Sequence, residues 1–447
     1  MIARNMRISF FKVFPFILLW LTLAGGVVQA MPPVKKMVLP NKLVLLVSQD
    51  HSLPLITIQL LINSGSRNDP DGKEGLANLT AKGLLLGTQE HAFNTVNEEL
   101  DFMGAFLDAS CSRDYAILNL KVLKKDLDKG LDLFTEVLTQ PNFPDEELRK
   151  EVQKMQAAIQ SAEENPMEVA EKAFRKALFL NSPYGHPVEG TMESLPQLTR
   201  DAVLGFYQTY YHPNNAILSI VGDITVDEVE SKLVPRLSKW VTGEIPKRDF
   251  ATTFAKGPVV VKTDRNITQA NIILGQPGIS RENPDFYALT VMNYILGGGG
   301  FASRLTEEIR SKKGFAYSVA SFFDPGKYTG SFQIVLQTKN PSTHEAISLA
   351  LQQLKRIREE PVSAKELEGA KKYLIGSFPM RFNNQEKLAS FLVQVEYYGL
   401  GLDYFEKYPS LINSISPEDV LRVAKKYLHP EDYILVVVAN LKEAGMD

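Results

Sequence analysis

Few side chains in this chain stand at spacings at which they could do chemistry together. The six histidines never pair at i, i+3 or i+4, the spacings with which one helix face holds a metal; they are His51, His91, His186, His212, His344 and His429. Cys111 is the only cysteine, which excludes an internal disulfide, and it lies in a predicted strand region where a buried structural Cys is the usual case. One local pattern is left, a run of four glycines: Gly297, Gly298, Gly299 and Gly300.

The helix that follows the first two predicted strands reads Gly75-Leu-Ala-Asn-Leu-Thr-Ala-Lys-Gly-Leu-Leu-Leu-Gly-Thr88. This frame resembles the metal-site helix of the pitrilysin/insulinase family of zinc peptidases, which includes the mitochondrial processing peptidase and bacterial two-domain relatives. Family members carry His-x-x-Glu-His here, in which two His bind Zn²⁺ and the Glu activates a bound water. In this chain those positions hold Asn78, Ala81 and Lys82. Asn is a poor zinc ligand, Ala cannot accept a proton, and Lys brings a cation to the place of the metal.

The resemblance also implies a third zinc ligand, a Glu on a later helix ahead of an Asp/Asn-Pro pair. The matching stretch, 151–159, precedes Asn165-Pro166; it places Ala158 at the ligand position and retains a supporting Glu of the family site as Glu151. With all four metal and base positions changed, we expect the isolated chain to bind no zinc or other cofactor and to cleave no peptide. Lys82 and Glu151 are the charged groups left, and we predict an ion pair between them, with Lys82 reaching solvent as the alternative.

A second stretch of resemblance, 296–318, contains the glycine run and, after it, Arg310 and Tyr317, seven residues apart. It looks like the family's C-domain motif, whose Arg and Tyr reach the metal site of the other half and hold the peptide backbone and the developing oxyanion. The resemblance implies these substrate-binding roles for Arg310 and Tyr317. For the glycines it implies a flexible loop beside a peptide channel, as in the non-catalytic subunit of the mitochondrial processing peptidase. The plain alternatives are a surface Arg, a core Tyr and a helix C-cap with a turn; a phosphate loop is excluded because no Gly-Lys-Ser/Thr follows.

An internal duplication supplies the elements that must position these residues. The stretch 199–204 resembles 416–421, an offset of 217 (416 − 199), and the match continues without a gap through Tyr-Tyr-His212-Pro and Tyr-Leu-His429-Pro. Nearer the start of each half, 66–71 matches 280–285 at an offset of 214 (280 − 66). Two nearly equal offsets predict two homologous units of about 210 residues. Because His212 and His429 occupy equivalent positions before Pro at the start of a strand, we expect them to be structural turn residues.

Each unit shows the same succession of predicted elements. Two short strands (43–47 and 55–62; 259–262 and 270–274) precede a helix, a further strand (115–120; 331–337), long amphipathic helices and a closing strand (216–221; 433–438). This order predicts an α+β class: two homologous domains, each a mostly antiparallel sheet with helices packed on one face. We place the N-terminal domain at 31–245, a linker at 246–257 and the C-terminal domain at 258–447.

The first thirty residues are typical of an export signal. Arg4, Arg7 and Lys12 precede an apolar stretch, and Val28-Gln-Ala30 offers the small residues that signal peptidase requires. We therefore expect an exported, periplasmic protein whose signal peptide is removed after Ala30. The alternative is an uncleaved membrane anchor, although the stretch is short for a span and is interrupted by proline and glycine.

Two functional hypotheses from different classes follow. The first is the substrate-binding, non-catalytic subunit of a heteromeric zinc metallopeptidase, in which a homologous partner with an intact His-x-x-Glu-His supplies the metal and the substrate is a peptide or unfolded polypeptide. The second is a non-catalytic scaffold or peptide-binding protein. The presence of both Arg310 and Tyr317 favours the first. A nucleic-acid partner is not expected, because the formal net charge is -3 and no basic stripe is present.

Overall fold

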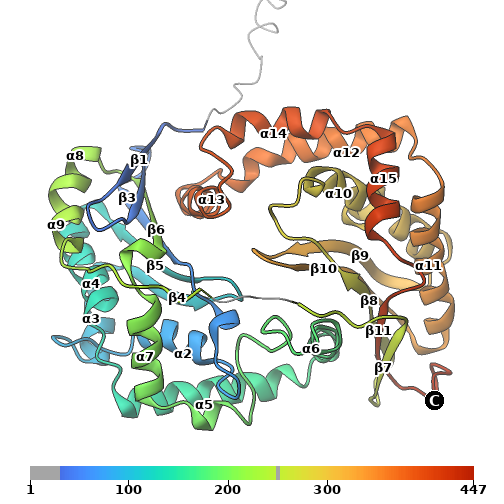
Figure 1. Ribbon diagram of the computed structural model, residues 1–447, viewed down its shortest axis with the longest axis horizontal. Helices are drawn as coiled ribbons and strands as arrows, with labels where there is room; N and C mark the ends of the chain where they lie inside the picture. Colours follow the sequence, from blue (N-terminus) through green and yellow to red (C-terminus); the bar gives the residue numbers. More distant parts are fainter. Residues whose placement is uncertain (1–30, 248–251) are drawn as a thin grey trace, which may run out of the picture. The chain divides into compact units, whose positions relative to one another are not determined.

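The computed structural model describes residues 31–247 and 252–447, and their strands form two sheets (Figure 1). The predicted signal peptide and residues 248–251 of the predicted linker lie outside the described residues. The first sheet has the order β1 (Val34–Val38), β2 (Val44–Gln49), β6 (Ala216–Gly222), β3 (Leu55–Ile62), β5 (Ala116–Leu123), β4 (Phe106–Cys111). The second has the order β7 (Val259–Asp264), β11 (Ile434–Ala439), β8 (Gln269–Pro277), β10 (Gly330–Lys339), β9 (Ala316–Pro325).

Strand pairing is mostly antiparallel in both sheets, and each sheet contains one parallel pair at its return strand. β6 runs parallel to β2 and antiparallel to β3, and β11 runs parallel to β7 and antiparallel to β8. In the middle of the first sheet, Ile58 lies opposite both Ile220 and Leu120. The same topology in both halves confirms the predicted α+β class and the duplication.

Helices connect the strands in both halves. In the first half they are α2 (Leu76–Gly83), α3 (Phe93–Met103), α4 (Leu127–Thr139), α5 (Asp145–Ala162), α6 (Pro166–Leu178), α7 (Arg200–Tyr210), α8 (Val226–Glu228) and α9 (Val234–Leu237). In the second half they are α10 (Phe286–Asn293), α11 (Thr343–Glu359), α12 (Ala364–Ser377), α13 (Gln385–Tyr397), α14 (Tyr404–Asn413) and α15 (Pro417–Tyr427).

Each sheet is covered on a second face by one helix of the other half, which the sequence did not reveal. α13 packs on β6 and β3, where Val393 shares a buried cluster with Leu61. Reciprocally, α6 packs on β11 and β8, where Phe174 shares a cluster with Val436 (Figure 1). Strands buried on both faces explain the largely apolar sequence LITIQLLI of β3 and the continuous apolar run ILVVVA of β11. α6 and α13 have 13 residues each and start 219 positions apart (385 − 166), so the exchange is itself duplicated.

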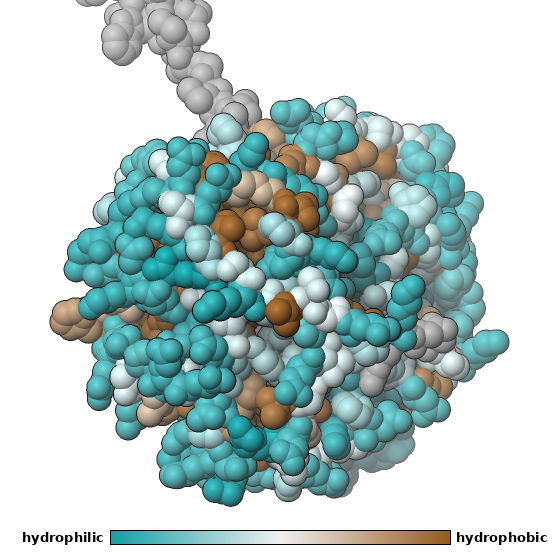
Figure 2. Space-filling model, turned by 60° about the vertical axis from the view of Figure 1, so that its left-hand side comes forward, coloured by the Kyte–Doolittle hydropathy of each residue, from teal (hydrophilic) through white to brown (hydrophobic). Residues whose placement is uncertain are grey.

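On the side of the molecule where the helices of the first sheet face the viewer, the described residues form no large apolar face. Figure 2 shows hydrophilic side chains over most of this side, with apolar ones in small separate groups. Such scattered apolar groups are normal for a folded surface. Within residues 31–247 and 252–447, none of the helices combines the length and the apolar character needed to span a membrane.

Candidate functional site

Helix α2 carries three of the altered metal-site positions, and groups outside the helix hold its first turn. Gly75 precedes it at φ 95°, in the left-handed region that favours glycine. The Asp69 carboxylate accepts hydrogen bonds from the backbone N–H groups of Gly75 at 2.9 Å and Ala77 at 2.7 Å. These are donors that a helix start would otherwise leave unpaired. α2 packs against α7, α5 and β4, so Asn78 and Ala81 are buried.

The predicted ion pair is confirmed. Lys82 Nζ donates to Glu151 Oε1 at 3.0 Å, which joins α2 to α5. The Glu151 side chain is only 10% exposed, whereas that of Lys82 is 38% exposed. Lys154, one turn further along α5, reaches the other carboxylate oxygen at 3.3 Å. Two ammonium groups therefore surround the one carboxylate retained from the family site.

These positions do not fit a zinc ion. Zinc requires three or four nitrogen, sulfur or carboxylate donors, whereas the site offers one amide, the methyl groups of Ala81 and Ala158, and a lysine already paired with Glu151. Ala158 lies seven residues after Glu151 on α5 and is exposed. In the described part of the chain, no group of three His, Cys, Asp or Glu side chains is placed to hold a metal.

The glycine run begins as helix, so the expected loop is wrong for Gly297 and Gly298. α10 continues into a π-helical segment, Tyr294–Gly298, and a short 3-10 turn follows at Gly300–Ala302. The reason is close packing against β9: a Cβ on Gly297 would lie 2.5 Å from the backbone nitrogen of Ser321. Gly300 has φ 56° and open space around it. The run thus ends a helix pressed against a strand.

Arg310 and Tyr317 lie together, as the motif predicts, with Phe301 as a third member. The Arg310 guanidinium carbon is 4.8 Å from the Phe301 ring centroid and 5.7 Å from that of Tyr317, distances typical of cation–π contacts. Tyr317 is 74% exposed, which excludes the core-Tyr alternative, and Phe301 is 75% exposed. Sequence reasoning missed Phe301, although a large apolar residue directly after the glycine run was a usable signal.

Phe301, Arg310 and Tyr317 form an aromatic–arginine cluster whose polar side-chain atoms form no hydrogen bond within the described residues. Neither the Arg310 guanidinium nor the Tyr317 hydroxyl forms a hydrogen bond with any other described residue. Likewise, no hydrogen bond, ion pair or ring contact within the described residues joins the cluster to Lys82, Glu151 or Ala158. Its donors can therefore be offered only to an external acceptor.

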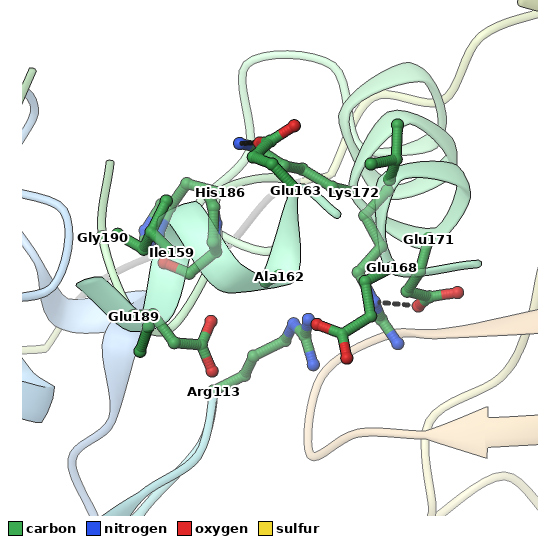
Figure 3. Close-up of a pocket in the computed structure, with 15 residues that line it drawn as sticks. Arg113, Ile159, Ala162, Glu163, Glu168, Glu171, Lys172, His186, Glu189 and Gly190 are labelled. Carbon is green, nitrogen blue, oxygen red and sulfur yellow. Dashed lines mark hydrogen bonds and ion pairs between the residues drawn. The ribbon is translucent and has the colours of Figure 1, made fainter. Parts of the chain in front are cut away.

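A cavity of about 490 Å³ lies beside the altered metal-site positions. Its walls are the end of α5 with Ala158, one side of α6, the loop 185–190, and Arg113, which reaches in from the segment before β5 (Figure 3). The loop is docked on the segment before α2, because a Cβ on Gly190 would lie 2.5 Å from the carbonyl oxygen of Glu74, and the Ser194 hydroxyl donates to that oxygen at 2.8 Å. The cavity and α2 are thereby held as one structure.

Most charges around the cavity are paired. Lys172 donates to Glu163 at 2.6 Å. Arg175 donates to Glu171 at 2.5 Å, the dashed line in Figure 3, and to Asp324 of the second half at 2.6 Å. These pairs fix α6 to the end of α5 and to β9.

Three charged side chains of the cavity lining form no ion pair with another described residue: Glu168, which accepts only a hydrogen bond from the Asn165 amide at 3.3 Å, Arg113 and Glu189. Arg113 and Glu189 form no hydrogen bond either, and Arg113 Nε is buried without an acceptor. His186, on the same wall, is no further cation, because burial lowers its pKa. Sequence reasoning missed both residues; nothing local marks them, since 76 positions separate them (189 − 113).

Two models of one peptidase family match this chain. The first, described as insulinase (peptidase family M16), matches residues 44–192, and the second, described as the peptidase M16 inactive domain, matches residues 197–374. A crystal structure of a peptidase M16 inactive domain from Pseudomonas fluorescens superimposes with a TM-score of 0.84 at 26% identity, covering 91% of this chain and 98% of that one.

Curated relatives carry related names. The chain is 28% identical to an uncharacterized zinc protease of Rickettsia bellii, over 86% of this chain and 90% of the relative. It is 27% identical to the non-peptidase homolog YmxG of Helicobacter pylori, over 90% and 93%. It is 23% identical to the probable mitochondrial-processing peptidase subunit beta of Arabidopsis thaliana, over 92% and 79%. Their names thus include a protease, a non-peptidase and a subunit of a peptidase.

Proposed function

This chain belongs to the insulinase (M16) family of peptidases as an inactive-type homologue, and on that premise we propose that it is the substrate-binding, non-catalytic subunit of a heteromeric zinc metallopeptidase. A homologous partner chain with an intact His-x-x-Glu-His supplies the metal and the activated water. This chain supplies Arg310 and Tyr317, which act on the partner's substrate. The complex works after export, and its substrate is a peptide or an unfolded polypeptide.

The observation that carries the proposal is a contrast between two sites of one chain. At the altered metal site, an ion pair of Lys82 with Glu151 takes the place of a metal. At the aromatic–arginine cluster, the half-buried Arg310 guanidinium and the exposed Tyr317 hydroxyl are unpaired among the described residues. Donors of this kind stabilise a carbonyl oxygen that gains negative charge. A chain that keeps them without its own metal has a use for them in another chain's reaction.

Phe301 supports the same role by restricting Arg310. Its ring, 4.8 Å from the guanidinium carbon, and the Tyr317 ring, 5.7 Å from it, both contact the arginine. A guanidinium held in this way loses less conformational freedom when it binds a peptide carbonyl. A relative named as a peptidase subunit is consistent with a member of this family acting within a complex.

The experiment is reconstitution with a partner. The full chain is mixed with the exported homologue of its own organism that carries an intact His-x-x-Glu-His, and peptide cleavage is measured for wild type, Tyr317→Phe and Arg310→Ala. Losing one oxyanion donor typically lowers turnover by about 10²–10³, so Tyr317→Phe should lower kcat of the complex by roughly that factor. Arg310→Ala should act more on KM, because it grips the substrate before reaction. The isolated chain should show neither activity nor stoichiometric zinc by metal analysis.

The matched control is Tyr373→Phe, which removes a hydroxyl from another exposed tyrosine of the second half; it should leave kcat unchanged. Co-purification should be unaffected in all variants, because the two Tyr→Phe changes each remove one hydroxyl and Arg310→Ala removes only contacts within the aromatic–arginine cluster. Full activity of both Tyr317→Phe and Arg310→Ala in an intact complex would overturn the proposal and leave the chain as a scaffold. One tightly bound zinc in the isolated chain, lost together with activity on chelation, would also overturn the proposal, because the chain would then be a metallopeptidase by itself.

A further inference from the structure

Arg113 lies inside a cavity, and its guanidinium forms no direct ion pair with a described residue, although the carboxylates of Asp324, Glu171 and Glu189 act on it at longer range. It is half-buried, its Nε is shielded from solvent without an acceptor, and it pairs with no other described residue. Burial, and then the nearby Arg175 guanidinium, lower its pKa. Buried donors are nearly always satisfied in folded proteins, by protein groups, water, an ion or a ligand, and the Nε of Arg113 finds no such partner within the described residues. Carboxylates are the usual bidentate partner of a guanidinium.

The other charges of the cavity define what such a guest carries besides its carboxylate. The lining contains three cationic side chains, Arg113, Lys172 and Arg175, and four carboxylates, Glu163, Glu168, Glu171 and Glu189. A guest with a carboxylate alone would meet a wall with one more negative than positive charge. Glu189 is exposed and without an ionic partner among the described residues. It can therefore take a positive group of the guest.

We propose that this cavity binds a short peptide by its two charged ends, the terminal carboxylate on Arg113 and the terminal ammonium on Glu189. The inference rests on the proposed function only in taking peptides as the class of ligand. The cavity volume, about 490 Å³, is within the range of small-ligand sites, about 300–1,000 Å³. The apolar part of the lining, with Ala158, Ile159, Ala162 and Val169, accepts small uncharged side chains.

The test is a crossed set of peptides and variants on the full chain without any partner, measured by isothermal titration calorimetry. The four peptides are trialanine with both ends free, its N-acetyl form, its C-terminal amide and the doubly capped form. Wild type should bind free trialanine at least about tenfold more tightly than either singly capped form, the change expected for the loss of a charge-assisted contact.

Each variant should remove one preference and keep the other. Arg113→Gln should bind the acid and the amide equally while still preferring a free amine. Glu189→Gln should bind the amine and its acetyl form equally while still preferring a free acid. Lys150→Gln is the matched control, because its ammonium lies outside the cavity lining and is paired with Glu146 and Glu147, and it should keep both preferences.

Several results would overturn the inference: no binding of trialanine by wild type, equal binding of all four peptides, or loss of both preferences in either variant. If Arg113→Gln does not fold, the inference is still tested by the four-peptide comparison on wild type and on the Glu189→Gln variant. The result is independent of the proposed function, since loss of kcat in the Tyr317→Phe complex depends on neither Arg113 nor Glu189. A chain that fails the trialanine test but loses turnover with Tyr317→Phe would refute the cavity inference alone.

Discussion

Lys82 places one positive charge where the family resemblance expects a divalent metal, and Glu151 balances it from the neighbouring helix. The pair is partly buried, with 10% of the Glu151 side chain exposed. Removing one partner of such a pair leaves a charge with poor solvation, which costs more than the intact pair contributes. The net contribution of the ion pair to the free energy of unfolding is therefore measured best with a variant that removes both charges.

Lys82→Met should lower the free energy of unfolding by about 1–3 kcal/mol, because Glu151 keeps only the longer contact to Lys154. The double variant Lys82→Met/Glu151→Leu should lie near wild type, since an apolar pair of similar volume can replace a buried ion pair. Urea denaturation of all three proteins measures this. Lys150→Met, which breaks only exposed pairs on α5, should leave stability unchanged; an equal loss in Lys82→Met and Lys150→Met would contradict the prediction.

At the scale of elements, Asp285 fastens the start of α10 to α15. It accepts hydrogen bonds from Arg422 at 2.7 Å, Lys426 at 2.8 Å and the Tyr427 hydroxyl at 2.9 Å. Burial alone would raise the pKa of Asp285, but hydrogen bonds from these three residues outweigh it and lower the pKa to about 2. The folded protein therefore binds the Asp285 proton less readily than the unfolded chain, whose value is 3.8.

Asp285→Asn should consequently destabilise the protein by about 1–2 kcal/mol at pH 7, a figure reduced for the half-exposed Arg422 and Lys426. The contribution of Asp285 is complete above its unfolded pKa and is lost as pH falls through about 2. The difference between variant and wild type should thus shrink as the pH is lowered from 4 toward 2. Urea unfolding across this range checks it, with the exposed Asp403→Asn as a control; a difference that does not depend on pH would count against the argument.

The whole molecule is tied together at Asp114, a buried carboxylate between the halves. Its oxygens accept from Arg67 and from the Tyr184 hydroxyl, and one of them accepts from the backbone N–H of Lys327 at 2.8 Å. Lys327 in turn donates to the carbonyl oxygen of Tyr397 on α13 at 3.1 Å. One carboxylate thus connects the first sheet's edge, the β9–β10 turn and the exchanged helix.

Asp114→Asn should cost about 2–4 kcal/mol, because the buried Arg67 guanidinium loses its anion. The loss should appear on both sides of the contact. Hydrogen exchange should therefore speed up in the β9–β10 turn and in α13, although both are more than 200 residues away in sequence (327 − 114 = 213). Protection lost only near residue 114 would show that the halves are held by other contacts.

Features that depend on contacts between residues close together in the sequence could be predicted from the sequence. The altered metal site could be identified from the sequence because its positions have a fixed spacing on single helices. Glu151 could be predicted as the partner of Lys82 because the family resemblance implies that these two helices pack together. Leu148, Met155 and Ile159 are buried on one face of α5 for the same local reason.

Long-range contacts left no comparable trace. The exchange of α6 and α13 was hidden because each helix shows an apolar face without showing which sheet it covers. The cavity charges were hidden because Arg113 and Glu189 approach only after α2, α5 and the loop 185–190 have packed. The glycine run was misjudged as a loop because its cause, close contact with Ser321, lies on a strand that follows it.

The exchanged helices also determine when, during synthesis of the chain, each sheet can be covered on its second face. The first sheet is complete in the chain at Gly222, yet the helix that covers its second face, α13, begins at Gln385, 163 residues later (385 − 222). Throughout that interval the side of the sheet with Leu61, Ile117 and Ile217 has no cover. A nascent chain with such a bare apolar face is a natural client for chaperones and is prone to aggregate. Neither half reaches its final packing before α13 has been synthesised.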